Sequence, residues 1–437
     1  MSETFTDILS LTLSRKRTGR YVVIHRVRSA FVIWASLAAC LVAGVMLSAE
    51  EQPPAPATLD VGDLWRDFRN RGDKPEETSP ATEQREERRF LVVAPTIGSK
   101  PATGLTGGLN GNMAFFRGDP KTTRISTMQG GFRVSQKKQV LSGFRLAMFT
   151  SDDRWYVQGD HRLQLSSQNT YGLGDATLKS GSENVKFTGV KVYETAYRKV
   201  APGLFVGAGL NLSSHSNVRP GDGLLPAWEE SAYMAYSQDH GFSPEGQISS
   251  GTTIGLLYDT RDNGINPQRG WLASSAYRTF YKGFLGGDSS WQELYLDLRT
   301  YRKITADGRH KLAFWAMSDL VTNGTAPYFD LPTTGGDGRS ARGYSEGRYR
   351  GNHLAYGEVE YRGTLTSNGL LGMVAFVNTT TIDNAAAGQK LFETWAPAGG
   401  AGLRLLLNKR SRTNLATDYA WGKGGARGFY LGIQEAF

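Results

Sequence analysis

From Phe90 to the end of the chain, hydrophobic and polar residues alternate with a period of two. In the segment 157–165 the odd positions are mostly apolar, and every even position is polar or charged. The same alternation returns in 204–212 and 414–422. A period of two is that of a β-strand, whose successive side chains point to opposite faces of the sheet. The region 90–437 is therefore predicted to be all-β.

Runs of this kind follow one another along the chain. Sixteen can be placed, near residues 90–97, 104–116, 122–133, 138–150, 153–166, 185–198, 202–213, 250–262, 269–282, 290–303, 310–322, 350–363, 370–382, 396–407, 412–422 and 428–437. A tilted strand needs roughly 9–11 residues to cross a bilayer, and most of these runs are long enough. Bacterial barrels of this kind have an even number of antiparallel strands. We therefore expect a 16-stranded antiparallel transmembrane β-barrel in the bacterial outer membrane.

The connections between the runs support this architecture. Tight turns occupy alternate connections, at 151–153, 201–202, 307–308 and 408–410. The long connections all belong to the other set, near 166–185, 214–249, 323–349 and 383–395. Short turns on one side and long loops on the other are typical of an even-stranded barrel with both termini in the periplasm. A soluble β-sandwich, the alternative, does not predict this division and would not place Leu and Tyr outside and Arg and Asp inside.

The last run, 428–437, alternates up to its final aromatic residue. The outward parity, which we expect to face lipid, holds Phe429, Leu431, Ile433 and Phe437, whereas Tyr430, Gly432 and Gln434 face the lumen. Aromatic residues are enriched where a membrane protein meets the water interface. Phe437 is therefore expected to end the last strand at that interface and to close the sheet. Glu435 breaks the outward row and is tolerable only near the interface.

The N-terminal region reads as an export signal. An apolar run covers 30–47, follows six basic residues and precedes Ser48 and Ala49. This order predicts a leader and secretory signal peptide in residues 1–49. A single transmembrane anchor and lipidation at Cys40 are the alternatives. Cys40 is the only cysteine of the chain, so the exported part has neither a disulfide nor a thiolate metal site.

Residues 50–89 are rich in Pro, Glu, Arg and Thr and predict a solvated periplasmic linker. A short helix can form within it, capped by Asp60 or Asp63. Its apolar face would consist of Leu64, Trp65 and Phe68. Forty residues are too few for a folded periplasmic domain of ordinary size.

Composition and charge exclude several classes of function. The chain has 437 residues, including 53 glycines and 19 tyrosines, which together with its negative mean hydropathy excludes a helical membrane protein. The formal net charge of +9 falls to +5 without residues 1–49, which hold six Lys or Arg and two Asp or Glu. This charge does not indicate a nucleic-acid partner. It suits contact with anionic outer-membrane lipid.

No constellation in the sequence predicts catalysis. Asp160 and His161 are neighbours on a strand, so their side chains point to opposite faces and cannot act together. The six histidines are scattered singly, and neither a metal-ligand spacing nor a phosphate-binding loop occurs. We therefore expect no enzyme, no metal and no cofactor.

Two segments are more specific than the alternation. Segment 255–271 contains Asp262, Asn263, Gly264, Asn266 and Pro267, which are turn residues, and we expect a periplasmic hairpin there. Segment 335–351 is rich in Gly and Arg and lies in the long loop before the run 350–363.

Both segments resemble the bacterial surface antigen family, the barrel domain of the BamA/TamA outer-membrane assembly superfamily. In that family a strand-turn-strand element is similar to Asp259-Thr-Arg-Asp262 followed by Asn266-Pro267 and Arg269-Gly-Trp271. Its sixth extracellular loop carries a tetrad of Val or Leu, Arg, Gly and Phe or Tyr. That tetrad stands here as Ala341, Arg342, Gly343 and Tyr344, and the resemblance covers about 90–437.

The resemblance implies that this loop folds into the lumen and that Arg342 pairs with acids of the inner wall. Parity selects Glu358, Glu360 and Asp418 as its partners. Family members often carry an Asp after an aromatic residue on the thirteenth strand, where this chain has Asn378. The alternative is that Arg342 lies in a solvated loop.

The resemblance further implies a seam between the first and last strands. Pro95 cannot donate a ladder hydrogen bond, and the glycines leave the last strand thin; with the terminal aromatic, the expected seam residues are Pro95, Gly428, Gly432 and Phe437. Pro95 could also simply end the first strand. Opening of the seam would let a client strand add by β-augmentation.

Assembly and secretion members of that family carry periplasmic POTRA modules, for which the linker 50–89 is too short. We therefore expect a reduced barrel that inserts, translocates or remodels outer-membrane components. Its expected partners are outer-membrane lipid, an unfolded or nascent outer-membrane protein client and a separate periplasmic protein. The alternatives are a channel for small solutes or lipids, plugged by the sixth loop, and a mainly structural membrane protein.

Overall fold

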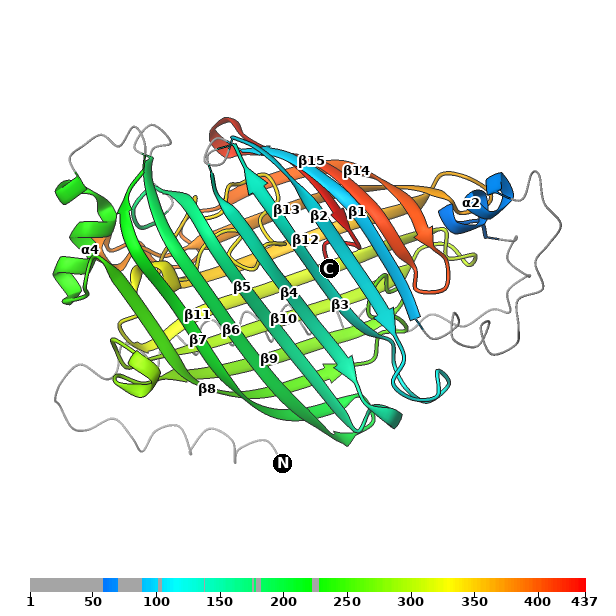
Figure 1. The fold of residues 1–437 in the computed structure, drawn as a ribbon, viewed down its shortest axis with the longest axis horizontal. Coiled ribbons are helices and arrows are strands. Elements are labelled where there is room, and N and C mark those ends of the chain that lie inside the picture. The colour runs from blue at the N-terminus through cyan, green and yellow to red at the C-terminus, as the bar shows by residue number, and fades with distance from the viewer. Residues whose placement is uncertain are drawn as a thin grey trace, which may run out of the picture. The chain divides into compact units, whose positions relative to one another are not determined.

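The computed structural model describes residues 58–69, 89–100, 104–136, 138–174, 177, 182–221 and 228–437. The predicted leader and signal peptide, residues 1–49, and most of the linker 50–89 lie outside these ranges. Within the described residues, sixteen antiparallel strands form one sheet in sequence order, which curls into a barrel (Figure 1). The predicted all-β barrel of sixteen antiparallel strands is confirmed.

The strands begin and end close to the predicted runs. The first eight are β1 (Arg89–Lys100), β2 (Gly104–Phe115), β3 (Ser126–Ser135), β4 (Val140–Phe149), β5 (Trp155–Thr170), β6 (Glu183–Ala201), β7 (Leu204–Pro220) and β8 (Gly246–Asp259). The second eight are β9 (Gly270–Phe280), β10 (Trp291–Lys303), β11 (His310–Gly324), β12 (His353–Thr364), β13 (Leu371–Ile382), β14 (Ala396–Asn408), β15 (Thr413–Gly422) and β16 (Ala426–Ile433).

Short helices accompany the sheet. In the part of the chain that the structure describes, the α-helices are α2 (Val61–Arg69) and α4 (Ala232–His240). The 3-10 turns are η2 (Ser151–Asp153), η4 (Trp228–Glu230), η5 (Phe284–Gly286), η6 (Tyr328–Asp330), η7 (Ala385–Ala387) and η8 (Lys423–Gly425). In the described ranges, no helix combines the length and the apolar character that spanning a membrane would require.

The longest connections all lie at one end of the barrel, whereas short connections occur at both ends. The long ones follow β5, β7, β11 and β13, and the one after β7 carries α4 (Figure 1). The turns after β4, β6, β10, β12 and β14 are short and lie at the other end, which we call the short-turn rim. This is the division that the turn residues predict.

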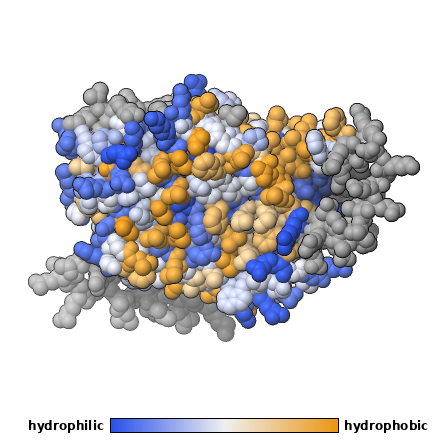
Figure 2. Space-filling model, in the orientation of Figure 1, coloured by the Kyte–Doolittle hydropathy of each residue, from blue (hydrophilic) through white to orange (hydrophobic). Residues whose placement is uncertain are grey.

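The outer face of the sheet is apolar. Leu91, Leu210, Ile254 and Val377 are between 58% and 70% exposed. Figure 2 shows hydrophobic residues spread over the strands of the visible wall, with hydrophilic residues toward both ends and in small patches between them. Polar residues of the inner face bond to one another instead, as where Asn211 Nδ2 donates to Thr253 Oγ1 at 2.7 Å. An apolar outside and a polar inside are what a membrane barrel requires.

A contact between two ionisable side chains interrupts this apolar wall near the middle of β5 and β6. His161 Nε2 lies 2.8 Å from Glu194 Oε2, and the imidazole stacks on Phe144 with ring centroids 4.4 Å apart. Both positions alternate with the lumen-facing Asp160 and Tyr193, so the pair belongs to the outer face. Ionisable groups on a lipid-facing wall cost free energy, most of all near the bilayer midplane.

We expect the double substitution His161→Leu with Glu194→Leu to stabilise the barrel. Replacing a poorly solvated pair of ionisable side chains by packed apolar ones is often neutral or raises the free energy of unfolding by about 1–4 kcal/mol. Denaturant unfolding of the barrel in lipid vesicles measures the change. Gln158→Leu on the lumen side of β5 serves as the control and should bring no gain. A loss of stability in the double variant would mean that this part of the wall does not face lipid.

The end of the chain does not follow the predicted strand. β16 stops at Ile433, and Gln434 turns the chain inward with φ 81°. Phe437 is only 4% exposed and packs in the lumen, with its ring centroid 5.2 Å from that of Trp315 (Figure 1). Arg362 Nη2 donates to the Phe437 carbonyl at 2.8 Å. The prediction that Phe437 faces lipid and closes the sheet is therefore wrong.

The physical reason is that the lumen offers better partners than the interface. Glu435, which would have broken the lipid-facing row, instead accepts from Arg404 at 2.7 Å and from Asn414 at 2.7 Å. A carboxylate pays a large desolvation cost in lipid, and paired contacts in the lumen remove that cost. The alternation of apolar and polar residues shows which face each side chain takes within a strand, but it does not show at which residue the strand ends.

The two edge strands, β1 and β16, lie beside each other without a ladder. In the described residues, β1 pairs only with β2, and β16 pairs only with β15. The strand β16 has 8 residues, fewer than the 12 of β1. Pro95 lies inside β1 opposite Leu109, so it does not end the strand. The sheet is thus a barrel whose two edge strands share no ladder.

Candidate functional site

Loop six, residues 325–352 between β11 and β12, carries the predicted tetrad and folds back against the inner wall. Gly343 has φ 109°, which is the left-handed region that favours glycine. A Cβ atom at this position would lie only 2.9 Å from the Cβ of Ala398 on β14. The glycine therefore lets the loop approach the wall closely enough for Arg342 to reach it.

Arg342 contacts three carboxylates of the inner wall. Its Nη1 donates to Asp418 Oδ2 on β15 at 2.7 Å, and its Nη2 donates to both Glu358 and Glu360 on β12. The Arg342 side chain is 4% exposed. The structure thus brings Arg342 together with all three partners selected by parity, and Arg342 does not lie in a solvated loop.

Electrostatics hold this contact strongly. Burial lowers the pKa of the Arg342 guanidinium, but the charges of Glu358, Glu360 and Asp418 outweigh burial and raise that pKa well above its ordinary value. Arg342 therefore stays charged across the physiological pH range. Hydrogen bonds between a guanidinium and carboxylates are among the strongest in proteins, and they are stronger still where water is excluded.

Two residues of β13 complete the surroundings of Arg342. The guanidinium carbon lies 3.5 Å from the ring centroid of Phe376, which is a cation–π contact. Asn378 Nδ2 donates to the Arg342 carbonyl at 3.1 Å. An aspartate, the residue often found at this place in the resembling family, could not donate that bond. Asn378 therefore holds the loop backbone instead of the guanidinium.

The rest of the tetrad connects loop six to the last strands. Gly343 donates its backbone N–H to the hydroxyl oxygen of Tyr430 on β16 at 2.9 Å. Tyr344 Oη donates to the Pro397 carbonyl on β14 at 2.6 Å and accepts from Lys423 N at 2.8 Å. Loop six thereby touches β12, β13, β14, β15 and β16.

A second row of arginines extends the network to the end of the chain. Arg362 Nε donates to Glu360 at 2.6 Å, and Arg404 Nη1 donates to Asp418 at 2.6 Å. Arg404 Nε also donates to Glu435 at 2.7 Å. Two of the acids that hold Arg342, Glu360 and Asp418, thus have a second arginine partner. Each of these arginines also bonds to the tail after β16, Arg362 to Phe437 and Arg404 to Glu435.

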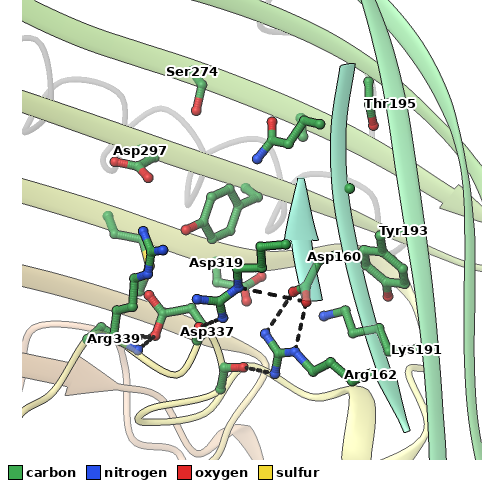
Figure 3. Close-up of a pocket in the computed structure, with 18 of the residues that line it drawn as sticks. Asp160, Arg162, Lys191, Tyr193, Thr195, Ser274, Asp297, Asp319, Asp337 and Arg339 are labelled. Atoms are coloured by element: carbon green, nitrogen blue, oxygen red, sulfur yellow. Dashed lines mark hydrogen bonds and ion pairs between the residues drawn. The ribbon is translucent and has the colours of Figure 1, made fainter. Parts of the chain in front are cut away.

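The opposite wall holds loop six through its backbone. Arg162 on β5 donates from Nη1 to the Gly336 carbonyl at 2.9 Å, and Arg145 on β4 donates to the Asp337 carbonyl. Figure 3 shows Asp160, Arg162 and Lys191 on neighbouring strands, facing Asp337 and Arg339 of the loop. Loop six is thus held from both sides of the lumen.

A cavity of about 420 Å³ remains between loop six and the wall formed by β3–β11. Positive and negative side chains share its lining, including Lys191, Arg339, Asp297 and Asp319 (Figure 3). Among the described residues, no group of three or more His, Cys, Asp or Glu is placed to hold a metal ion. The lumen is a charged, partly filled interior.

The residues expected at the seam do not form one cluster. Pro95 is exposed on the outer face of β1, and nothing lies within 4 Å of a Cβ placed on Gly432. A Cβ on Gly428 would lie 2.5 Å from Tyr430 Oη, so this glycine makes room for the tyrosine that bonds to loop six. Phe437 lies in the lumen.

The sequence alone does not predict several residues of this network. Arg362 and Arg404 have the lumen parity of their strands, and Arg404 is an isolated charge in a run of Leu and Gly, which is a usable signal. The contacts of Phe376 and Tyr430 with the loop have no such signal, because they depend on where the loop lies.

The chain is similar to known outer-membrane proteins in sequence and in fold. Residues 227–437 match the model of the Omp85 superfamily domain. Among solved structures, the chain is similar to BamA from Haemophilus ducreyi lacking POTRA domains 1–3, with 14% identity and a TM-score of 0.50. That alignment covers 79% of this chain and 69% of the BamA chain.

The chain is also similar to CdiB from Acinetobacter baumannii, with 12% identity, a TM-score of 0.49 and coverage of 80% of this chain. CdiB from Escherichia coli gives 12% identity, a TM-score of 0.47 and coverage of 83% of this chain. This chain spans 59% and 63% of the two CdiB chains, which is less than two thirds of each. A search of curated proteins finds no match.

Proposed function

This chain carries an Omp85 superfamily domain in residues 227–437, and from that premise we propose that it inserts, translocates or remodels outer-membrane components through the seam between β1 and β16. It is a bacterial outer-membrane β-barrel of the BamA/TamA type. The similarity to BamA supports the barrel fold of this chain. The proposed role rests on the two edge strands of this chain, β1 and β16.

The observation that carries the proposal is the missing ladder between β1 and β16 in the described residues. Backbone N–H and C=O groups without partners are costly inside a bilayer, so an edge there favours any strand that can pair with it. A client strand could add to the free edge of β1 or β16 by β-augmentation. Pro95 removes one donor from β1, which makes closure of the barrel weaker.

Loop six supports the second edge of the seam. Through Arg342 and Tyr344 it holds β12, β14 and β15, and through Gly343 it holds Tyr430 of β16. With the neighbouring strands fixed, β16 can part from β1 while its own pairing with β15 stays intact. In this proposal loop six sets the position of the seam rather than acting as the gate.

The proposed partners follow from the same picture. An unfolded or nascent outer-membrane protein supplies the client strand, outer-membrane lipid surrounds the seam, and a separate periplasmic protein delivers the client. We propose that both termini of the barrel face the periplasm, because short turns lie on that side in bacterial barrels. The proposal includes neither a nucleic acid nor an enzymatic step.

A disulfide across the seam tests the proposal. Val93→Cys on β1 is combined in turn with Phe429→Cys or Leu431→Cys on β16, in a chain whose Cys40 is replaced by Ser. The measurement is the rate at which unfolded outer-membrane proteins fold into vesicles that contain the barrel. We expect oxidation to abolish the acceleration and reduction to restore it.

The matched control cross-links strands that are already paired. Leu91 and Met113 stand opposite each other in β1 and β2, so a disulfide between Leu91→Cys and Met113→Cys should leave the rate unchanged. If the barrel accelerates client folding equally with the seam locked, seam opening is not its mechanism.

A channel for small solutes or lipids, plugged by loop six, is the second candidate. The charged cavity of about 420 Å³ beside the loop favours it. Conductance of the purified barrel in planar bilayers separates the two functions. A channel should conduct with the seam locked, and Arg342→Ala should enlarge its conductance. A steady conductance that Arg342→Ala leaves unchanged would contradict the plug.

A further inference from the structure

The short helix α2 lies outside the barrel and has strong local reasons to form. Asp63 N donates to Asp60 Oδ1 at 2.8 Å, and Asp60 N donates to Asp63 Oδ2 at 3.0 Å. This reciprocal arrangement is a capping box that starts the helix. Asp60 is thus the cap, and the carboxylates also stabilise the positive end of the helix dipole.

The same two carboxylates fasten α2 to the short-turn rim. Lys409, in the turn between β14 and β15, donates its backbone N–H to Asp60 Oδ2 at 2.8 Å and its Nζ to Asp63 Oδ2 at 2.8 Å. Leu59 N donates to the Asn368 carbonyl, in the turn between β12 and β13, at 3.0 Å. Figure 1 shows α2 at the rim where β14 ends.

The other face of α2 is apolar and uncovered. Leu64 is 44% exposed, Trp65 is 63% exposed and Phe68 is 70% exposed. Their spacing puts them on one side of the helix, where the rings of Trp65 and Phe68 stack 6.2 Å apart. A helix held at its polar end that displays two aromatic rings to water is poorly suited to an aqueous surface.

We propose that α2 is an in-plane membrane anchor whose face of Leu64, Trp65 and Phe68 enters the leaflet at the short-turn rim. The leaflet is the occupant because the face continues the lipid-facing surface of the barrel. Next to α2, Leu365 and Leu371 at the turn between β12 and β13 are 53% and 42% exposed. Trp and Phe on one face of a short helix, with charges on the other, are typical of helices at the membrane interface.

The anchor has a structural consequence for the chain before the barrel. It leads residues 58–69 along the outside of the rim, fixed by Lys409, rather than into the lumen. Short turns lie at the periplasmic side of bacterial barrels, so the leaflet involved is the periplasmic one. The inference depends on the outer-membrane location and not on the proposed seam mechanism.

A fluorescent label on α2 tests the proposal. Phe68→Cys is labelled with an environment-sensitive dye in a chain whose Cys40 is replaced by Ser, and the barrel is reconstituted into phosphatidylethanolamine and phosphatidylglycerol vesicles. We expect a blue-shifted emission that nitroxide lipids quench. Adding Leu64→Ser and Trp65→Ser to the labelled chain should reduce that quenching, and heat-modifiable gel mobility verifies that the barrel remains folded.

The matched control places the same dye on Asp307→Cys, in the exposed turn between β10 and β11 at the same rim. We expect this label to report water and to escape quenching. Equal emission and quenching at positions 68 and 307 would overturn the proposal. The apolar face of α2 would then lie in water and would be free to bind a protein partner. A blue shift without lipid quenching, dependent on protein concentration, would overturn it in favour of a second copy of the chain.

Discussion

Arg342→Ala is expected to lower the free energy of unfolding by about 3–5 kcal/mol, which is the usual cost of removing one partner from a buried ion pair. The substitution removes the cation that Glu358, Glu360 and Asp418 share, so that Arg362 and Arg404 remain beside Glu360 and Asp418 while Glu358 loses its ion pair. Like charges in a poorly solvated site repel one another strongly. Denaturant unfolding of the barrel in vesicles, followed by tryptophan fluorescence, measures the loss.

The same variant should release loop six from the wall. We expect trypsin to cut the loop after Arg339 or Arg348 much faster than in the native barrel, because the tetrad no longer holds the loop. Arg154→Ala is the control, since Arg154 is 70% exposed in its weak contact with Asp152, and such pairs contribute about 0–1 kcal/mol.

A second variant identifies the cause of the effect. Combining Arg342→Ala with Glu358→Gln and Asp418→Asn removes most of the uncompensated charge, so part of the lost stability should return. If the triple variant is no more stable than Arg342→Ala, the lost free energy comes from packing against Phe376 and not from electrostatics.

Arg404→Ala is expected to have a comparable effect, again about 3–5 kcal/mol, for a different reason. Arg404 is the side chain that connects Asp418, in the Arg342 cluster, to Glu435 in the tail after β16. Without it Glu435 retains Asn414 as a neutral partner and loses its charged one. We therefore expect the tail to leave the lumen, and Phe437 with it.

A spin label on Ala436→Cys, in a chain with Cys40→Ser, measures that movement. The label should be immobile in the native background and mobile in the Arg404→Ala background. Arg412→Ala provides the control, because the Arg412 side chain is 35% exposed in its pair with Asp262, and partly exposed pairs of this kind contribute about 0–1 kcal/mol. An immobile label in Arg404→Ala would mean that Arg362 and the aromatic contacts hold the tail alone.

The two losses should not add. Arg342 and Arg404 both donate to Asp418, so after the first substitution the second removes less. A double variant that lost the full sum of the two effects would indicate that the arginines act independently.

Much of the fold follows from local patterns. Sixteen alternating runs and the division between short turns and long loops are sequence features, and the strands of the described residues follow them. Parity also indicates which acids can face Arg342, because every second residue of β12 and β15 points inward. The sequence could not reveal Phe376, Tyr430 or Arg404 as neighbours of the loop, since those contacts join strands that are far apart along the chain.

The last residues of the chain show which features the sequence can predict and which depend on the tertiary structure. By itself the sequence determined a sixteen-stranded barrel with an apolar outside, because a strand in lipid must alternate at every step. Only the tertiary structure decided that β16 ends early, that Phe437 lies in the lumen and that β1 and β16 remain unpaired. These outcomes depend on the competition between lipid, interface and the arginines of the lumen, which no local pattern records.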